Sequence, residues 1–145
     1  TTGLDPQARH ILWDRLFRLK EQGVTLVMVT HFMDEAEQLC DRLVVMDHGQ
    51  IVAEGSPSSL IKQYSSREVA EVRFGSERNA AMVDELRDLA GRIEVLPDRI
   101  LMYADDGEGL LEEVHRRGLN PVTSLVRRSS LEDVFLRLTG RSLID

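Results

Sequence analysis

One histidine stands where chemistry could take place, because His31 directly follows the run VTLVMVT at residues 24–30. The run is apolar or β-branched at successive positions, which predicts a strand covered on both faces, as in a parallel sheet flanked by helices. Ligands of such open sheets gather outside the carboxyl ends of the strands. The sequence therefore predicts that His31 contacts a ligand and that neighbouring elements position it.

The residues before this run predict the helix that supports it. Asp5 can cap free backbone N–H groups, and Pro6 suits the first helical position. Gly23 is suited to end the helix in a left-handed conformation. A helix, a glycine and a buried strand form half of a βαβ unit. An apolar face at helical spacing is formed by Ala8, Ile11, Leu12, Leu16 and Leu19, and Trp13 and Phe17 make this face wider.

The chain after His31 predicts four further short elements. Residues 32–40 predict a helix with acids in its first turns. Residues 42–47 predict a strand, and His48-Gly49 predicts the tight turn into its hairpin partner at residues 50–54. A Gly-Ser-Pro break at residues 55–57 then predicts a short helix that ends near Tyr64.

The pattern changes at Ser65-Ser66, which we interpret as a domain boundary. From there the order of predicted elements is β-α-β-β-α-β, the ferredoxin-like signature. A last helix follows, because Ser130 and Asp133 form an S-x-x-D start and Gly140 can end it. The predicted fold is an α/β fragment with parallel strands at residues 1–65, followed by an α+β ferredoxin-like domain with a C-terminal helix at residues 66–145.

Composition excludes several function classes. The chain has 145 residues, 42% of them hydrophobic, and a formal net charge of −7, which argues against a nucleic-acid groove. No apolar run approaches the ~20 residues that span a bilayer, and the N-terminal residues lack a basic-apolar-small pattern, so we expect no signal peptide. The chain has no initiator Met, so we expect an excised fragment. The single cysteine, Cys40, fits a reducing compartment and does not favour a zinc site.

Other candidate sites are weaker on chemical grounds. His31 and Glu35 share a helix face at i, i+4, but two such ligands occur often by chance and do not favour a metal site. Cys40 lies on the apolar face of its helix and is interpreted as a small buried hydrophobe. No spacing supports catalysis by paired carboxylates. The remaining histidines have no convergent partners in the sequence and are His10, His48 and His115.

Several motifs resemble one family when they are taken in order. The stretch TTGLDP at residues 1–6 resembles the D-loop of ATP-binding cassette (ABC) transporter ATPases, and VTH at residues 29–31 resembles their H-loop, or switch histidine. The stretches that follow also resemble this family: FMDEAE, DRLVVM and the hairpin sequence GQIVAEGSP, which ends at residue 57. The tail SLEDVFLRLTG at residues 130–140 resembles the C-terminus of the drug-export branch, the daunorubicin-resistance-type ATP-binding subunits.

This resemblance implies a role for each matched residue. His31 would reach the γ-phosphate of ATP and help to position the attacking water or stabilise charge on the transferring group. Gly3, Leu4 and Asp5 would lie at the interface with a second ATP-binding subunit and couple the two nucleotide sites. Thr30 would hold the end of the strand. The implied cofactors of the parent protein are ATP and Mg²⁺.

The sequence also departs from the family. It contains no G-x-x-x-x-G-K-[ST] phosphate loop, no LSGGQ-type signature, no Q-loop and no Walker B Asp-Glu pair. Phosphoryl transfer depends on the loop, its Lys and Mg²⁺. We therefore expect that the parent hydrolyses ATP to ADP and phosphate and that these 145 residues alone do not.

The resemblance also implies partners and a location. The parent would be a subunit of a multidrug or antibiotic exporter, paired as a homodimer, bound to a transmembrane permease and held at the cytoplasmic face of the membrane. Residues 66–145 would serve regulation or subunit contacts. A fragment of such a core would leave apolar faces and strand edges exposed, so we expect a non-native or swapped dimer. The alternative is a free-standing small-molecule sensor, which the codons upstream of Thr1 would test.

Overall fold

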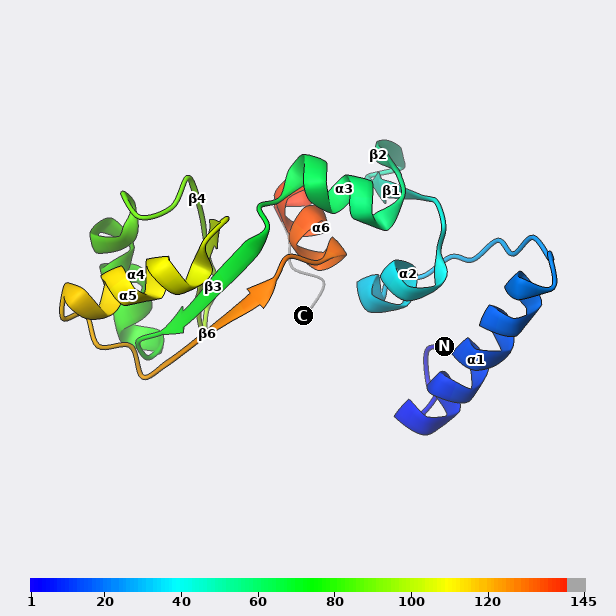
Figure 1. The fold of residues 1–145 in the computed structure, drawn as a ribbon, viewed down its shortest axis with the longest axis horizontal. Coiled ribbons are helices and arrows are strands. Elements are labelled where there is room, and N and C mark those ends of the chain that lie inside the picture. Colours follow the sequence, from blue (N-terminus) through cyan, green and yellow to red (C-terminus); the bar gives the residue numbers. More distant parts are fainter. Residues whose placement is uncertain (141–145) are drawn as a thin grey trace.

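The computed structural model describes residues 1–140, and residues 141–145, the end of the predicted second domain, lie outside the described residues. The molecule is elongated (Figure 1): helix α1 lies at one end, a four-stranded sheet lies at the other, and a group of short elements lies between them. The described residues form a mixed α/β chain with six helices and two antiparallel sheets.

Helix α1 (Pro6–Glu21) begins and ends as the sequence predicts. The Asp5 carboxylate caps it by accepting a hydrogen bond from the backbone N–H of Ala8 at 2.8 Å. Gly23 follows the helix with φ 84°, a conformation that glycine adopts without strain. The predicted apolar face is only partly covered, however, because Trp13 is the one buried residue of the helix.

The predicted buried strand at residues 24–30 is wrong. These residues pair with no strand in residues 1–140, and the side chains of Val27 and Val29 are 94% and 98% exposed. A strand forms only where a neighbour accepts its backbone hydrogen bonds. The expected parallel sheet is also wrong for the described residues, since both sheets are antiparallel.

The central group of elements follows the sequence prediction closely. It comprises α2 (Met33–Leu39), β1 (Leu43–Asp47), β2 (Gln50–Gly55) and α3 (Pro57–Tyr64). The hairpin turns at His48 and Gly49, whose φ values of 48° and 73° are those of the two central residues of a type I′ turn. Ser56 caps α3 through a hydrogen bond from the backbone N–H of Ser59 at 3.2 Å.

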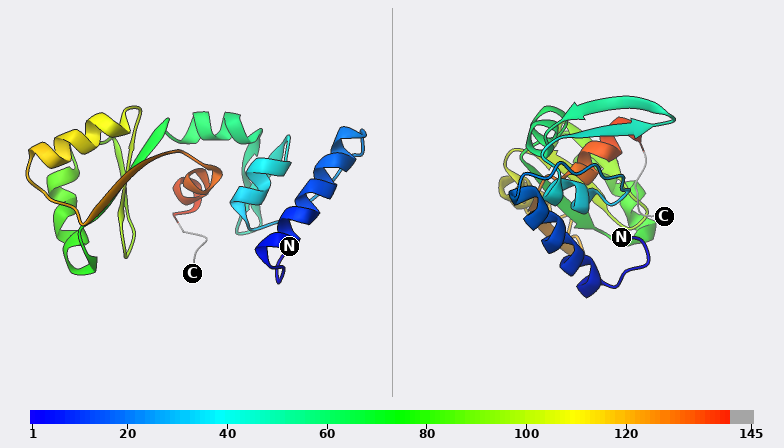
Figure 2. Two further views of the ribbon diagram at one scale, coloured as in Figure 1. Left: turned by 60° about the horizontal axis from the view of Figure 1, so that its bottom comes forward. Right: turned by 90° about the vertical axis from the view of Figure 1, so that its right-hand side faces the viewer.

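The predicted β-α-β-β-α-β order is confirmed after residue 67. The elements are β3 (Glu68–Arg73), α4 (Ser76–Leu86), β4 (Arg92–Val95), β5 (Ile100–Ala104), α5 (Gly107–Arg116) and β6 (Thr123–Arg128). The strand order in the sheet is β4-β5-β3-β6. Helices α4 and α5 cover one face (Figure 2), where a core that includes Val72, Phe74, Met102 and Val114 is nearly inaccessible to solvent.

The last helix, α6 (Leu131–Thr139), returns from the sheet to the central group. Leu131 and Val134 pack in one cluster with Ala36 of α2, Val45 of β1 and Leu60 of α3. On its other side, α6 contributes Leu136 to a cluster on the second face of the sheet. The helix therefore joins the two halves of the molecule through apolar contacts.

Candidate functional site

His31 lies in the turn that leads into α2, and its side chain is exposed. Its ring packs on the neighbouring ring of Phe32, with the two centroids 4.3 Å apart. Within residues 1–140 the imidazole has no hydrogen bond or ion pair. Both of its ring nitrogens are therefore available to a ligand.

Thr30 fixes the backbone just before α2. Its hydroxyl oxygen accepts a hydrogen bond from the backbone N–H of Phe32 at 2.9 Å. This is a side-chain turn of the kind that Ser and Thr commonly form. The family resemblance implies that Thr30 holds the end of a strand, and in the structure it holds the turn that presents His31.

Glu35 is the buried centre of this region, with 1% of its surface exposed. Its carboxylate accepts hydrogen bonds from Trp13 Nε1 at 2.9 Å and from the Thr1 hydroxyl at 3.2 Å. Burial acts to raise the pKa of Glu35, but hydrogen bonds from Thr30, Trp13 and Thr1 outweigh it and hold the pKa below its usual range. The sequence marks Glu35 only as a metal-ligand partner of His31, and no pattern in it predicts this organising role.

The turn at residues 1–5 lies against α2 because Thr1 bonds to Glu35. Gly3 adopts φ 83°, and the N–H of Leu4 donates to the carbonyl of Thr1 at 3.2 Å. Gly3, Leu4 and Asp5 are all exposed. The structure thus brings the N-terminal turn and the residues around His31 to the same end of α2 and leaves the turn open to contact.

Few side chains hold α1 against α2. Besides the bond from Trp13, the Arg9 guanidinium stacks on the Phe32 ring at 4.7 Å from its centroid. At the far end, Lys20 donates to the carbonyl of Leu39 at 3.2 Å and pairs with a surface aspartate. The position of the N-terminal turn relative to His31 therefore depends on a small number of polar and aromatic contacts.

These residues can contribute hydrogen bonds to an anionic ligand but do not form a complete catalytic centre. Within residues 1–140, no group of three or more His, Cys, Asp or Glu side chains could hold a metal ion. Burial raises the pKa of the Cys40 thiol, which favours the inert thiol expected of a packing residue. No helix in the described part of the chain is long and apolar enough to cross a membrane.

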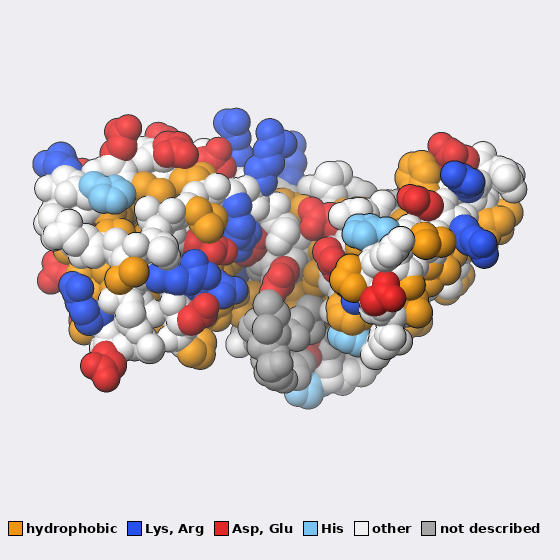
Figure 3. All heavy atoms as spheres, turned by 90° about the horizontal axis from the view of Figure 1, so that it is seen from below, with side chains coloured by type: hydrophobic (Ala, Val, Ile, Leu, Met, Phe, Trp, Pro, Cys, Tyr) orange, Lys and Arg blue, Asp and Glu red, His pale blue; other side chains and the backbone are white. Residues whose placement is uncertain are grey.

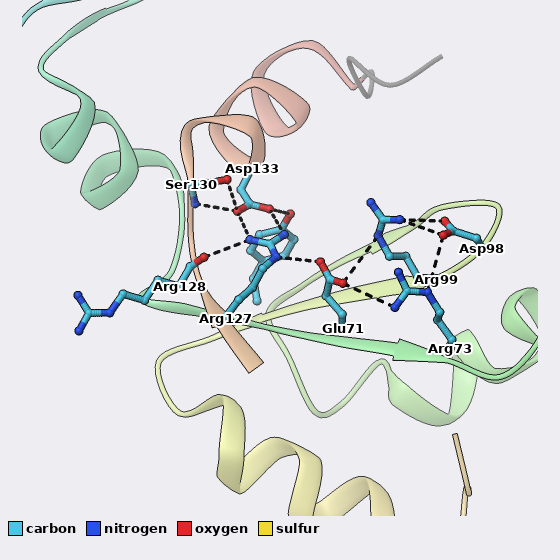
Figure 4. A network of polar contacts seen from close by, with 9 residues as sticks. Glu71, Arg73, Asp98, Arg99, Arg127, Arg128, Ser130 and Asp133 are labelled. Atoms are coloured by element: carbon cyan, nitrogen blue, oxygen red, sulfur yellow. Dashed lines mark hydrogen bonds and ion pairs between the residues drawn. The ribbon is translucent and has the colours of Figure 1, made fainter. Parts of the chain in front are cut away.

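A second polar cluster lies on the face of the sheet that α6 covers (Figure 4). Arg127 donates to Asp133 at 2.7 Å and to Glu71 at 2.8 Å, and the Tyr103 hydroxyl donates to Asp133 at 2.7 Å. Asp133 is 2% exposed and also accepts the backbone N–H of Ser130 at 2.8 Å. Both oxygens of Asp133 are thus engaged, and the cluster ties α6 to the sheet.

Comparison with known proteins relates the whole chain to one group. Residues 79–140 match the family described as "Nodulation factor export protein NodI, C-terminal domain". The chain is 46% identical over 143 residues to the Nod factor export ATP-binding protein I of Rhizobium sp. (strain N33), a match that covers 99% of this chain and 46% of that protein. It is 45% identical over 145 residues to the protein of the same name from Burkholderia orbicola (strain AU 1054), covering all of this chain and 46% of that one. The chain therefore spans about half the length of these relatives.

Proposed function

We propose that this chain is the C-terminal part of the ATP-binding subunit of an ABC exporter. It is related to such subunits over its whole length. The observation that carries the proposal is the buried Glu35, which hydrogen-bonds the N-terminal turn and α1 beside the turn that presents His31. Relatedness along the entire chain favours this function over a free-standing sensor.

In this proposal His31 is the switch histidine. Its exposed imidazole, which forms no hydrogen bond or ion pair within the described residues, donates a hydrogen bond to an oxygen of the γ-phosphate or holds the attacking water. Thr30 keeps the imidazole in place by fixing the turn at Phe32. Mg²⁺, when bound with ATP, neutralises charge on the phosphates. The phosphate loop and the metal ligands come from residues outside these 145.

The proposed D-loop is the exposed turn of Gly3, Leu4 and Asp5. Because Asp5 caps α1, its carboxylate also fixes the angle at which the turn leaves the helix. The turn faces a second ATP-binding subunit in a homodimer and couples the two nucleotide sites. A change at one site would reach α2 through Thr1 and Glu35.

The test is His31→Ala in the full-length subunit, with His48→Asn as the matched control. His48 lies in the hairpin turn at φ 48°, which Asn tolerates, and is distant in sequence from the proposed site. We expect His31→Ala to lower the ATPase rate at least about a hundredfold and to leave ATP binding intact. ATPase rates that match between the two variants would exclude the switch role.

The isolated 145-residue chain is proposed to be inactive, because its sequence contains no phosphate loop. Incubation of the purified chain with ATP and Mg²⁺ tests this. We expect no release of phosphate above the uncatalysed background. Mg²⁺-dependent turnover that follows the purified chain through a final chromatographic step would contradict it.

Residues 66–145 are proposed to form a ferredoxin-like accessory domain that regulates the transporter or contacts its other subunits. The segment between Ser65 and Ser129 can be deleted with a short replacement, because the hydroxyls of these two residues lie 3.0 Å apart. A short Gly-Ser linker in place of residues 66–128 removes the four-stranded sheet and keeps α6 on the central group. We expect loss of assembly or of transport coupling, and unchanged transport would refute the role.

The remaining partners follow from the proposed subunit. A transmembrane permease would hold it at the cytoplasmic face of the cell membrane. Relatives named for Nod factor export give no support to the multidrug or antibiotic cargo expected from the sequence, so we propose a cargo of the Nod factor type. Co-purification of the full-length subunit with a transmembrane permease, followed by transport assays with each cargo class, distinguishes these possibilities.

The chain alone is proposed to self-associate through its exposed apolar side chains. Ile11 and Phe17 on α1 are 52% and 46% exposed, and Val27 and Val29 are almost fully exposed; apolar side chains lie at the α1 end of the surface in Figure 3. Sedimentation at high concentration should show a dimer that Val27→Glu dissociates. A monomeric wild-type chain would contradict this, and in the full subunit the rest of the ATPase core would cover the same surface.

A further inference from the structure

An open groove of about 500 Å³ lies where α3 meets the sheet. Its walls come from α3, from the link between α3 and β3, and from the ends of β5 and β6. Ile61 is the single large aliphatic residue among those that line it. The groove is separate from His31, Glu35 and the N-terminal turn, none of which lines it.

Positive charge gathers in this groove. Lys62, Arg67 and Arg128 line it together with one carboxylate, that of Asp105. Figure 3 shows Lys and Arg side chains gathered near the middle of the molecule, along the upper edge of that view. A local excess of cations is unexpected in a chain whose formal net charge is −7, and it attracts anions.

The three cations have no partner among residues 1–140. Neither the Lys62 ammonium nor the guanidinium groups of Arg67 and Arg128 form a hydrogen bond or an ion pair there. Figure 4 shows the Arg128 side chain pointing away from the network that engages its neighbour Arg127. Other arginines of the sheet are paired, as Arg127 of β6 is with Asp133 and Arg92 of β4 is with Glu94.

Hydrogen bonds hold the walls of the groove in place. Ser65 donates to Ser129 at 3.0 Å, and the N–H of Ser129 donates to the carbonyl of Arg67 at 3.2 Å. The Asp105 carboxylate accepts a hydrogen bond from the backbone N–H of Arg67 at 3.2 Å. It therefore fixes the backbone of the groove wall and also reduces the local positive charge. The three cations are therefore carried by backbone that is already fixed.

We propose that this groove binds the phosphate group of an anionic ligand. Guanidinium forks and serine hydroxyls match the geometry of phosphate oxygens, and an ammonium adds a point charge. Lys62 lies on α3, whereas Arg67 and Arg128 lie on the two neighbouring strands or their ends, so a bound phosphate links α3 to the sheet. The phosphate can belong to a soluble phosphate ester or to a phospholipid headgroup. The site is independent of the proposed ATPase function.

The experiment titrates the 145-residue chain with inorganic phosphate and pyrophosphate, and with vesicles of phosphatidylglycerol or of phosphatidylcholine. The site variant is Lys62→Gln/Arg67→Gln/Arg128→Gln. The matched control is Arg15→Gln/Arg18→Gln/Arg78→Gln, which removes the same charge from exposed positions on α1 and α4. Asp105→Asn keeps an oxygen acceptor for the Arg67 N–H and removes the negative charge from the groove.

We expect the site variant to weaken binding on the order of tenfold or more and the control to change it less than about twofold. Asp105→Asn should tighten binding about threefold, a gain that misfolding cannot produce. Binding of soluble phosphates together with phosphatidylglycerol supports a general phosphate site, and binding of phosphatidylglycerol vesicles alone supports a lipid headgroup. No binding of any anionic probe, or equal losses in the two triple variants, would overturn the proposal.

Discussion

The clearest contrast in the molecule is between two stretches that have strand-like sequences. Residues 24–30 and strand β3 are both rich in valine, yet Val29 is 98% exposed and Val72 is 0% exposed. Strand β3 lies between β5 and β6 and pairs with both. Residues 24–30 pair with no strand in the described part of the chain. Both sequences predict a strand, one through an uncharged apolar or β-branched run and the other through valines set between charged residues, and the pairing partners decide the outcome.

The helices show the same contrast. Helix α5 buries Leu110, Leu111 and Val114 against the sheet. Helix α1 also carries large apolar side chains at helical spacing, but Ile11 and Phe17 remain about half exposed. An amphipathic helix buries its face only where a complementary surface exists. The end of the molecule near α1 therefore depends on polar contacts such as that of Glu35, whereas the sheet end depends on its apolar core.

The largest expected change in the free energy of unfolding comes from a substitution in the sheet core, and it can be compared directly with a substitution in residues 24–30. Phe74→Ala removes a ring that is 2% exposed and leaves a cavity in the sheet core, which should lower the free energy of unfolding by about 3–5 kcal/mol. Val29→Ala should change it by less than about 0.5 kcal/mol, because that side chain is 98% exposed. Urea denaturation of the 145-residue chain measures both. A comparable loss for Val29→Ala would mean that residues 24–30 are packed in solution.

Asp133→Asn should have the next largest effect. The substitution removes a charge that is 2% exposed and leaves Glu71 as the one remaining carboxylate partner of the Arg127 guanidinium among the described residues. The expected loss in the free energy of unfolding is about 3 kcal/mol. Asp84→Asn is the control, because its pair with Arg87 is exposed and should contribute almost nothing. Equal losses in the two variants would show that burial of Asp133 carries no energetic weight.

The same carboxylate should make stability depend on pH. Burial acts to raise the pKa of Asp133, but the hydrogen bonds and charge of Arg127, with the Tyr103 hydroxyl, hold it below its ordinary value of 3.8. The stabilisation is therefore complete above the unfolded pKa and is lost as the pH falls below about 4. Urea midpoints measured from pH 6 to pH 3 should fall more steeply for wild type than for Asp133→Asn. Parallel curves would exclude the linkage.

Local signals explain which features the sequence predicts. The Asp5 cap, the turn at His48-Gly49 and the order of elements from β3 to α6 depend on residues close in sequence, and all are present. The predicted strand at residues 24–30 depended on a partner that its sequence does not specify. The bond between Tyr103 and Asp133, and that between Trp13 and Glu35, join residues 30 and 22 positions apart, for which no local pattern exists.

Around the candidate site, too, contacts between residues far apart in the sequence could not be predicted. His31 is predicted because it follows a recognisable run, Thr30 is predicted only through the family resemblance, and the roles of both remain proposals. Glu35 was missed as an organiser, since its burial arises only when α1 folds back over α2. A single sequence signal was available: an acid among the apolar positions of a short helix, whose burial requires hydrogen-bond donors.

Glu35→Ala should loosen the α1 end without unfolding the sheet. The substitution leaves the indole N–H of Trp13 without its acceptor, at an expected cost of about 2 kcal/mol for docking of α1. Since Trp13 is the one tryptophan of the chain, its fluorescence should shift to longer wavelength as the ring becomes hydrated. Asp34→Ala, an exposed acid on the same helix, should leave the spectrum unchanged. An unshifted spectrum in Glu35→Ala would mean that apolar packing alone positions α1.

Ser130→Ala should have the smallest effect on the free energy of unfolding. Ser130 precedes α6, the helix that joins the central group to the sheet. The hydroxyl donates to Asp133 at 3.2 Å, whereas the backbone N–H of Ser130 donates to the same carboxylate at 2.8 Å and survives the substitution. The expected loss is therefore limited to about 1 kcal/mol, typical of a helix cap. Ser124→Ala, on the exposed edge strand β6, should cost nothing measurable. A loss as large as that of Asp133→Asn would mean that the hydroxyl, and not the buried carboxylate, holds α6 against the sheet.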